Sequence, residues 1–191
     1  MDIALNEDKT FENTDYSERK FSNREVVNCE FINCNFSKGD LSNSDFMDCI
    51  FQSCNFSLAI IENTGIKNVK FIDSKLMGVD FGKCNNFLFS PSFENCQLDY
   101  CSFFQKKMKK TSFLDCSLKE VDFTEVDLTM AVLQNCDLLN ASFVRSILEK
   151  TDFRTARNYS LDPELNKIKK ARFSLAGIAG LLSKYNIDIE P

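Results

Sequence analysis

The chain has 191 residues, of which 43% are hydrophobic and 27% are charged, and it carries a formal net charge of −5 with no histidine. This length suits one domain, and an acidic chain lacks the broad basic stripe that follows a nucleic-acid backbone. The sequence contains neither an apolar run of about 18 residues nor a signal-peptide pattern at Met1. We therefore expect a cytoplasmic protein that neither spans a membrane nor binds nucleic acid directly.

A period of five residues organises most of the chain. A large apolar residue recurs at every fifth position from Phe11 to Phe81, and a small residue usually stands two positions before it. After a slip of two residues the same pattern resumes at Leu88 and continues to Phe153. Five is neither the helix period of 3.6 nor the strand period of 2. The pattern indicates a repeat protein.

A second period, four times as long, lies over the first. Similar residues recur at this longer spacing in several columns, for example Phe103, Phe123 and Phe143, and also Cys96, Cys116 and Cys136. The period predicts that four fives close one coil and that successive coils stack like side chains in ladders. Each unit of such a solenoid buries its apolar face only against its neighbours.

All nine cysteines stand at the small position of the repeat. Neighbours such as Cys29 and Cys34 are separated by four residues, unlike the C-x₂-C spacing of many zinc sites, and histidine is absent. An odd number of cysteines in a reducing compartment also argues against disulfides. We therefore expect buried thiols that fill the core, with no metal and no other cofactor.

Three segments follow from the extent of the repeat. We predict an N-terminal segment at residues 1–10, a repeat solenoid at residues 11–157, and a C-terminal linker, helix and tail at residues 158–191 that caps the rod or joins two copies. The first segment is polar and either frays or folds over the first coil.

The slip between Gly82 and Phe87 predicts a bulge or a short loop on one side of the solenoid. Phe87 and Phe89 flank Leu88, so one or both are candidate exposed aromatic residues. Two interpretations remain open: the insertion packs locally, or an aromatic side chain contacts a partner.

A basic run follows the slip. Lys106 stands at a small inward position, and three further lysines surround it: Lys107, Lys109 and Lys110. Such a run on an acidic protein is either a solvated face or a docking patch for an acidic partner.

One coil later the charge reverses. Five carboxylates fall within thirteen residues: Asp115, Glu120, Asp122, Glu125 and Asp127. Asp122 and Asp127 stand directly before large positions and either bind nearby backbone N–H groups as turn residues or belong with the other three to an acidic surface that binds a partner.

The C-terminal segment predicts a short helix with Ser174 as its N-cap and Asn186 close to its end. Five apolar side chains share one stripe of this helix: Leu175, Ile178, Leu181, Leu182 and Tyr185. Gly177 and Gly180 lie on the other side and weaken the helix by about 1 kcal/mol each. Such a helix forms only if its stripe is buried.

Repeats such as CNFSK, SDFMD, CDLLN and TDFRT resemble the pentapeptide-repeat family. The resemblance implies an all-β solenoid, a right-handed quadrilateral β-helix. The short helix and the IDIE tail resemble the Qnr-type quinolone-resistance branch and the related microcin-immunity proteins. That likeness implies a homodimer through the helical stripe, which mimics DNA, binds DNA gyrase or topoisomerase IV and protects it from inhibitors. The chain lacks the sizeable loops of some members, and its acidic charge is small.

Two classes of function remain after an enzyme is set aside. The chain has no histidine, no evident nucleophile with a base and no glycine-rich phosphate loop, so we expect no catalysis. The first class is a DNA-mimicking topoisomerase binder. The alternative is a general protein–protein interaction scaffold with an unknown partner.

Overall fold

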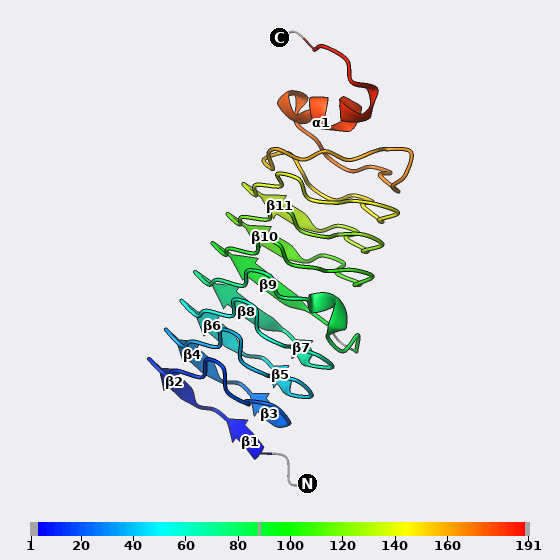
Figure 1. Cartoon of the computed structure of the whole chain (residues 1–191). Helices are drawn as coiled ribbons and strands as arrows, with labels where there is room; N and C mark the ends of the chain where they lie inside the picture. Colours follow the sequence, from blue (N-terminus) through cyan, green and yellow to red (C-terminus); the bar gives the residue numbers. More distant parts are fainter. Residues whose placement is uncertain (1–3, 88, 190–191) are drawn as a thin grey trace.

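Parallel strands stack at a spacing of one coil between Ala4 and Gln134. A computed structural model describes residues 4–87 and 89–189 and shows them wound into a β-solenoid that ends in a short helix (Figure 1). One sheet contains β1 (Ala4–Glu7), β3 (Arg24–Val27), β5 (Asp45–Met47) and β7 (Gly65–Lys67) in that order. The other runs in the order β11 (Val132–Gln134), β10 (Ser112–Leu114), β9 (Pro91–Glu94), β8 (Val69–Ile72), β6 (Ile50–Gln52), β4 (Glu30–Ile32) and β2 (Thr10–Glu12).

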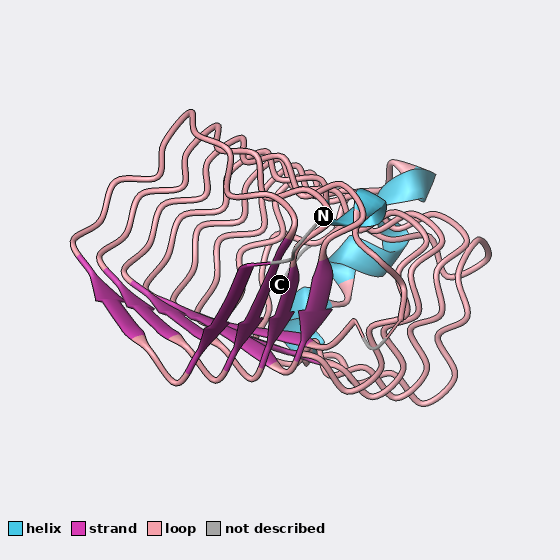
Figure 2. Ribbon diagram, turned by 90° about the horizontal axis from the view of Figure 1, so that it is seen from below, coloured by secondary structure: helices cyan, strands magenta, loops and turns pink. Residues whose placement is uncertain are grey.

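The strand register confirms that four fives close one coil. Phe31 pairs with Phe51, four repeats later, whereas the pairing of Phe71 with Phe93 spans the slip and is longer by the two inserted positions. Isolated parallel bridges at the same spacings continue the ladder on the remaining sides. Viewed from below, the coils lie one behind another and the strands gather on two sides (Figure 2). The predicted all-β solenoid of pentapeptide repeats is confirmed.

Aromatic columns fill the interior. The rings of Phe103 and Phe123 stack with their centroids 5.4 Å apart, and those of Phe123 and Phe143 stack at 5.1 Å. Rings of adjacent columns meet edge to face, as Phe113 and Phe123 do at 6.0 Å. Both arrangements are the ones that the quadrupole of an aromatic ring favours. The core therefore consists of ring stacks along the axis, locked to one another across it.

The corners of the coils explain the abundance of Asn and Asp. The second residue after most large positions has a positive φ, as at Asn33 and Asn68, a conformation that Asn and Asp tolerate better than most residues. Their side chains also bind one another between coils: the Asn68 amide donates to Asp48 Oδ1 at 2.6 Å. These corners thus turn the chain, and those that pair Asn with Asp also tie successive coils together.

The small inward residues leave space for the large ones and also donate hydrogen bonds to the backbone. The Cys54 thiol donates to the Phe31 carbonyl oxygen at 3.3 Å, and the Ser44 hydroxyl donates to the Phe21 carbonyl oxygen at 3.0 Å. Each residue thereby binds a backbone carbonyl of the preceding coil. Cys, Ser and Thr suit this position because they combine small volume with a hydrogen-bond donor.

Both ends of the ladder lie beyond the boundaries expected from the pattern of fives. Strand β1 lies within residues 1–10 and pairs with β3. The ladder also continues beyond residue 157, because Lys167 forms a bridge with Ile147 and Arg172 forms one with Asp152. The Phe173 ring stacks on Phe153 at 5.3 Å. The linker before the terminal helix therefore follows the path of a further coil. No helix in the described part of the chain is long and apolar enough to cross a membrane.

Candidate binding surfaces

The terminal helix is built as three short pieces. These are the 3₁₀ turn η2 (Leu175–Gly177), the α-helix α1 (Ala179–Leu182) and the 3₁₀ turn η3 (Ser183–Tyr185). The Ser174 hydroxyl caps the start by accepting from the Gly177 N–H at 3.2 Å, and Asn186 ends the segment with a φ of 47°. Both predicted ends are confirmed. The continuous helix is not, because two glycines weaken it and 3₁₀ turns are frequent at helix ends.

The glycines face the end of the rod. A Cβ atom on Gly180 would overlap the Tyr159 carbonyl oxygen, and one on Gly177 would overlap the Tyr159 ring hydroxyl. The Leu161 N–H donates to the Gly180 carbonyl at 3.0 Å, so the backbones are in direct contact. Lys184 completes the contact through Asp162 Oδ1 at 2.8 Å and Glu164 Oε2 at 2.7 Å. The residues that weaken the helix are therefore those that let it lie on the rod.

This docking leaves much of the apolar stripe uncovered. Leu175 is 87% exposed, Ile178 is 42% exposed and Tyr185 is 54% exposed. Leu181 is half-buried and packs against the core, and Leu182 is half-buried as well. A short helix that turns its glycines inward and three of its five large apolar side chains outward has an unusual orientation for a surface helix. The outward residues are a candidate interface.

The two candidate aromatic residues at the slip have different environments. Phe87 is 77% exposed, whereas Phe89 is buried and its ring meets the Phe81 ring edge to face at 6.2 Å. Of the two candidates, Phe87 is therefore exposed and Phe89 is not, because the Phe89 ring points into the coil and fills space there. Leu88, where the repeat was expected to resume, lies outside the described residues. The loop follows the 3₁₀ turn η1 (Phe81–Lys83) and lies beside β7 (Figure 1).

Lys106 is buried although its three lysine neighbours are exposed. Its amine donates to the Cys84 carbonyl at 2.6 Å and to Asn86 Oδ1 at 2.7 Å, and it lies 5.0 Å from the centre of the Phe89 ring. Burial lowers the pKa of this amine. The solvated interpretation of the basic run thus fails at Lys106, which instead holds the inserted residues of the preceding coil in place.

Replacing Lys106 with methionine should destabilise the protein by about 1–3 kcal/mol, because the buried Cys84 carbonyl would lose its donor. Urea unfolding followed by circular dichroism measures the loss. Lys107→Met, at an exposed neighbour, is the matched control and should stay within about 0.5 kcal/mol of the unmodified protein. Equal stability of the two variants would show that Lys106 is not a structural donor.

The structure does not bring the five carboxylates onto one surface. Asp115, Glu120 and Glu125 occupy three successive corners of one coil, and Asp122 and Asp127 lie on two different sides of it. Because four repeats of five residues close one coil, equivalent positions of consecutive repeats lie on different sides of the rod. A run of acidic residues along the sequence is therefore distributed around the coil. The five carboxylates are thus spread around the coil, and Glu120, Asp122 and Glu125 border one side of it.

Each of these carboxylates has a hydrogen-bond partner, but only Asp122 and Asp127 bind the backbone as the turn interpretation predicts. Asp122 and Asp127 each accept from the backbone N–H two positions further on, at 2.9 Å and 3.0 Å respectively. Glu125 accepts from Arg145 Nη2 at 2.6 Å, and hydrogen bonds from Gln105 and Arg145 hold the pKa of Glu125 below its usual value. Amide ladders bind the other corners: Asn135 donates to Asp115 and Asn140 donates to Glu120.

The nine cysteines are free and buried, as predicted. Within the described ranges, no group of three or more His, Cys, Asp or Glu side chains could hold a metal ion. Burial raises the pKa of Cys49 to about 11 and that of Cys54 to about 12. Cys49 and Cys54 are therefore thiols at neutral pH, and their reactive thiolate forms are scarce.

A thiol reagent such as DTNB should label few of the nine cysteines in the native protein and all nine after denaturant is added. Absorbance of the released chromophore measures the number. Rapid native labelling of most thiols, or stoichiometric zinc by elemental analysis, would contradict buried and metal-free cysteines.

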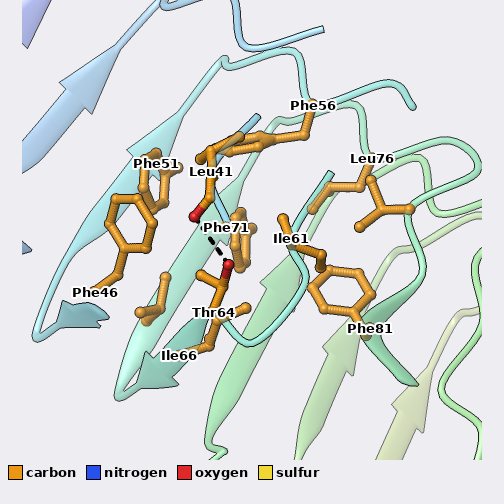
Figure 3. Close-up of a pocket in the computed structure, with 12 residues that line it drawn as sticks. Leu41, Phe46, Phe51, Phe56, Ile61, Thr64, Ile66, Phe71, Leu76 and Phe81 are labelled. Atoms are coloured by element: carbon orange, nitrogen blue, oxygen red, sulfur yellow. Dashed lines mark hydrogen bonds between the residues drawn. The ribbon is translucent and has the colours of Figure 1, made fainter. Parts of the chain in front are cut away.

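The interior contains a small void between the coils that carry Leu41 and Phe81 (Figure 3). Its volume is about 20 Å³, and apart from Thr64 its lining is apolar. The Thr64 hydroxyl is already used, because it donates to the Leu41 carbonyl at 3.0 Å. A void of this size and polarity is a packing defect of the core. Binding is expected on the outside of the rod.

Several contacts at these surfaces could not be predicted from the repeat pattern. Tyr159 and the two terminal glycines meet only because the linker follows a coil path. The contact of Lys106 with the Cys84 carbonyl depends on the longer register across the slip. The unusual lysine at a small inward position was the one available sign, since an inward cation needs partners.

Two family models match the sequence. The model described as "Pentapeptide repeats (8 copies)" matches residues 27–64, and the model described as "Pentapeptide repeat region" matches residues 74–153. Together they cover more than half of the chain. No match is found among curated protein sequences.

Solved structures resemble this chain at low identity. A trypsin-treated form of QnrB1, a plasmid-mediated fluoroquinolone resistance protein, is 18% identical with a TM-score of 0.45, over 98% of this chain and 100% of that one. HetL from the cyanobacterium Nostoc, a pentapeptide repeat protein involved in heterocyst differentiation regulation, is 15% identical with a TM-score of 0.36, over 90% and 87%.

Proposed function

Because this chain belongs to the pentapeptide-repeat family, we propose that it is a non-enzymatic binding protein that acts as a homodimer. A solenoid presents long side surfaces and two ends, on which a partner can be held without any active site. Function on such a fold resides in particular surfaces and cannot be read from the fold alone.

The observation that carries the proposal is the orientation of the terminal helix. Its glycines contact Tyr159 of the rod, while Leu175, Ile178 and Tyr185 face outward at one end of the molecule. A second copy related by a twofold axis would cover the same side chains on both molecules at once. Burying a large apolar side chain contributes about 1.5–3 kcal/mol, so a few such contacts per copy favour association.

The partner we propose is a bacterial type II topoisomerase, DNA gyrase or topoisomerase IV, at the surface where it binds duplex DNA. The resemblance of the terminal helix and tail to the Qnr-type branch supports this partner. The local acidic residues of the rod would have to stand in for phosphates, and the dispersed carboxylates at residues 115–127 give only part of such a pattern.

Competition with DNA tests the proposed partner. Purified gyrase bound to a fluorescently labelled duplex should release the DNA as this protein is added, and fluorescence anisotropy should fall. If this protein and DNA exclude one another from the same site on gyrase, the apparent affinity of gyrase for DNA should decrease in proportion to the added protein. Unchanged DNA binding at a large excess of the protein would contradict the proposal.

A general interaction scaffold is the second candidate. The exposed Phe87 favours it, because an aromatic side chain on a short loop is a frequent element of protein–protein contacts. If Phe87→Ala abolishes binding of a partner while Ile178→Asp does not, the side of the rod is the binding surface.

A further inference from the structure

A groove lies on the side of the rod beside the inserted loop. Its volume is about 180 Å³, and its floor is the outward face of the sheet formed by β3, β5 and β7. Phe87 forms one wall, and Met47 and Val27 supply further apolar surface. Strands β3, β5 and β7 lie in the half of the solenoid toward the N-terminus, whereas the terminal helix lies at the other end (Figure 1).

The aromatic wall is held from behind. The Phe87 N–H donates to Asn85 Oδ1 at 2.9 Å, which fixes the turn that presents the ring. The next residue toward the N-terminus, Asn86, accepts from the buried Lys106 amine at 2.7 Å. Phe87 is therefore 77% exposed on a loop whose base is anchored to the core. Such a ring is ready to contact a partner at small entropic cost.

Two carboxylates line the same groove without a cation between them. Glu25 and Asp45 are direct neighbours in the parallel register of β3 and β5. Both are exposed, and neither takes part in an ion pair within the described residues. Like charges side by side on neighbouring strands repel one another. The Asp45 carboxylate also occupies the space that a side chain at Gly65 would need.

The one lysine of the groove does not neutralise this pair. Lys67 Nζ lies 3.5 Å from the Met47 sulfur. One cation against two carboxylates still leaves the groove with a net negative charge. A ligand that adds a positive charge, an apolar stem and a flat surface for the Phe87 ring would meet each of these features.

We propose that this groove binds an arginine side chain from a basic segment of a partner protein. A guanidinium group is planar, stacks on aromatic rings and donates to two carboxylate oxygens at once, whereas the ammonium group of lysine is a point charge. Its aliphatic stem would pack on Met47 and Val27. The inference does not depend on the proposed homodimer or on a topoisomerase, because none of its residues belongs to the terminal helix.

The test uses the full-length ¹⁵N-labelled protein and the peptide acetyl-Gly-Leu-Arg-Leu-Arg-Gly-amide, titrated by NMR. The amide signals of Glu25, Asp45 and Phe87 should shift on binding. Replacing both arginines of the peptide with citrulline, which is neutral and of the same shape, should weaken binding about tenfold or more. A lysine peptide should fall between the two.

Variants of the protein locate the site. The double substitution Glu25→Gln and Asp45→Asn should weaken binding about tenfold, and Phe87→Ala should weaken it about threefold or more. All three side chains are exposed, so the fold should persist and the remaining NMR spectrum verifies it. Two exposed residues on a different side of the rod are matched controls: Phe104→Ala and Glu62→Gln should leave the affinity unchanged.

Four outcomes would overturn the proposal: absence of binding at millimolar peptide, equal binding of the citrulline peptide, shifts confined to another surface, or variants that bind like the unmodified protein. Each of them would leave the DNA-competition result untouched, since that experiment does not involve the groove.

Discussion

Phe123→Ala should destabilise the solenoid by about 3–5 kcal/mol, the range found when a buried phenylalanine is truncated. Phe123 is fully buried in mid-column, stacked between Phe103 and Phe143, and the Phe113 ring meets it edge to face. Removing the ring deletes three aromatic contacts and leaves a cavity that a rigid stack of coils cannot close. Urea unfolding followed by far-ultraviolet circular dichroism measures the loss.

The matched control for Phe123 is Phe104→Ala, which removes a ring that is 40% exposed on the outside of the same rod. We expect a change within about 0.5 kcal/mol, typical of surface substitutions. A loss below about 1 kcal/mol for Phe123→Ala would lie well outside the usual range for buried aromatic residues. Such a result would mean that the columns do not carry the stability of the fold.

Ile178→Asp should convert the proposed homodimer into monomers. The side chain stands near the centre of the outward stripe, between Leu175 and Tyr185, and is 42% exposed in a single chain. An unpaired carboxylate in an apolar interface is strongly unfavourable, so the dimer dissociation constant should rise by about 100-fold or more. Light scattering across a concentration series measures the association, and circular dichroism should show an unchanged β-solenoid.

The control for Ile178 is Leu139→Asp, the same kind of change at a leucine that is 45% exposed on the side of the rod. This variant should dimerise like the unmodified protein. An unmodified protein that is monomeric at micromolar concentration would refute the homodimer. So would an Ile178→Asp variant that dimerises normally, because the stripe would then lie outside the interface.

The sequence predicted the fold well because a single period controls it. Every inward column, the closure of the coil after four fives and the burial of the cysteines follow from which positions are large or small. Phe123 could be placed between Phe103 and Phe143 by counting alone. The slip could be located too. Which of its two phenylalanines is buried could not be predicted, since neither Phe87 nor Phe89 stands at a large position of the repeat.

The binding surfaces were less predictable, because they depend on contacts between coils. The carboxylates from Asp115 to Asp127 are close in sequence but dispersed around a coil by the same period that builds the core. Glu25 and Asp45 are distant in sequence and adjacent in space. Only the register between successive coils, combined with the loop that brings Phe87 over the sheet, joins them into one groove.

The terminal helix shows that the amphipathic pattern alone does not predict which face of a helix is buried. The stripe from Leu175 to Tyr185 predicts a buried face, yet the face that meets the rod carries Gly177 and Gly180. Glycine has no hydropathy to signal this contact. The reason becomes visible only when Tyr159 closes the end of the core and leaves no room for a Cβ atom above it.

The most direct test of the proposed function is a DNA gyrase supercoiling assay with ciprofloxacin, with and without this protein. If the protein binds gyrase and protects it, supercoiling at an inhibitory drug concentration should recover as protein is added, and Ile178→Asp should be less effective. Equal inhibition with and without a molar excess of the unmodified protein would contradict the account.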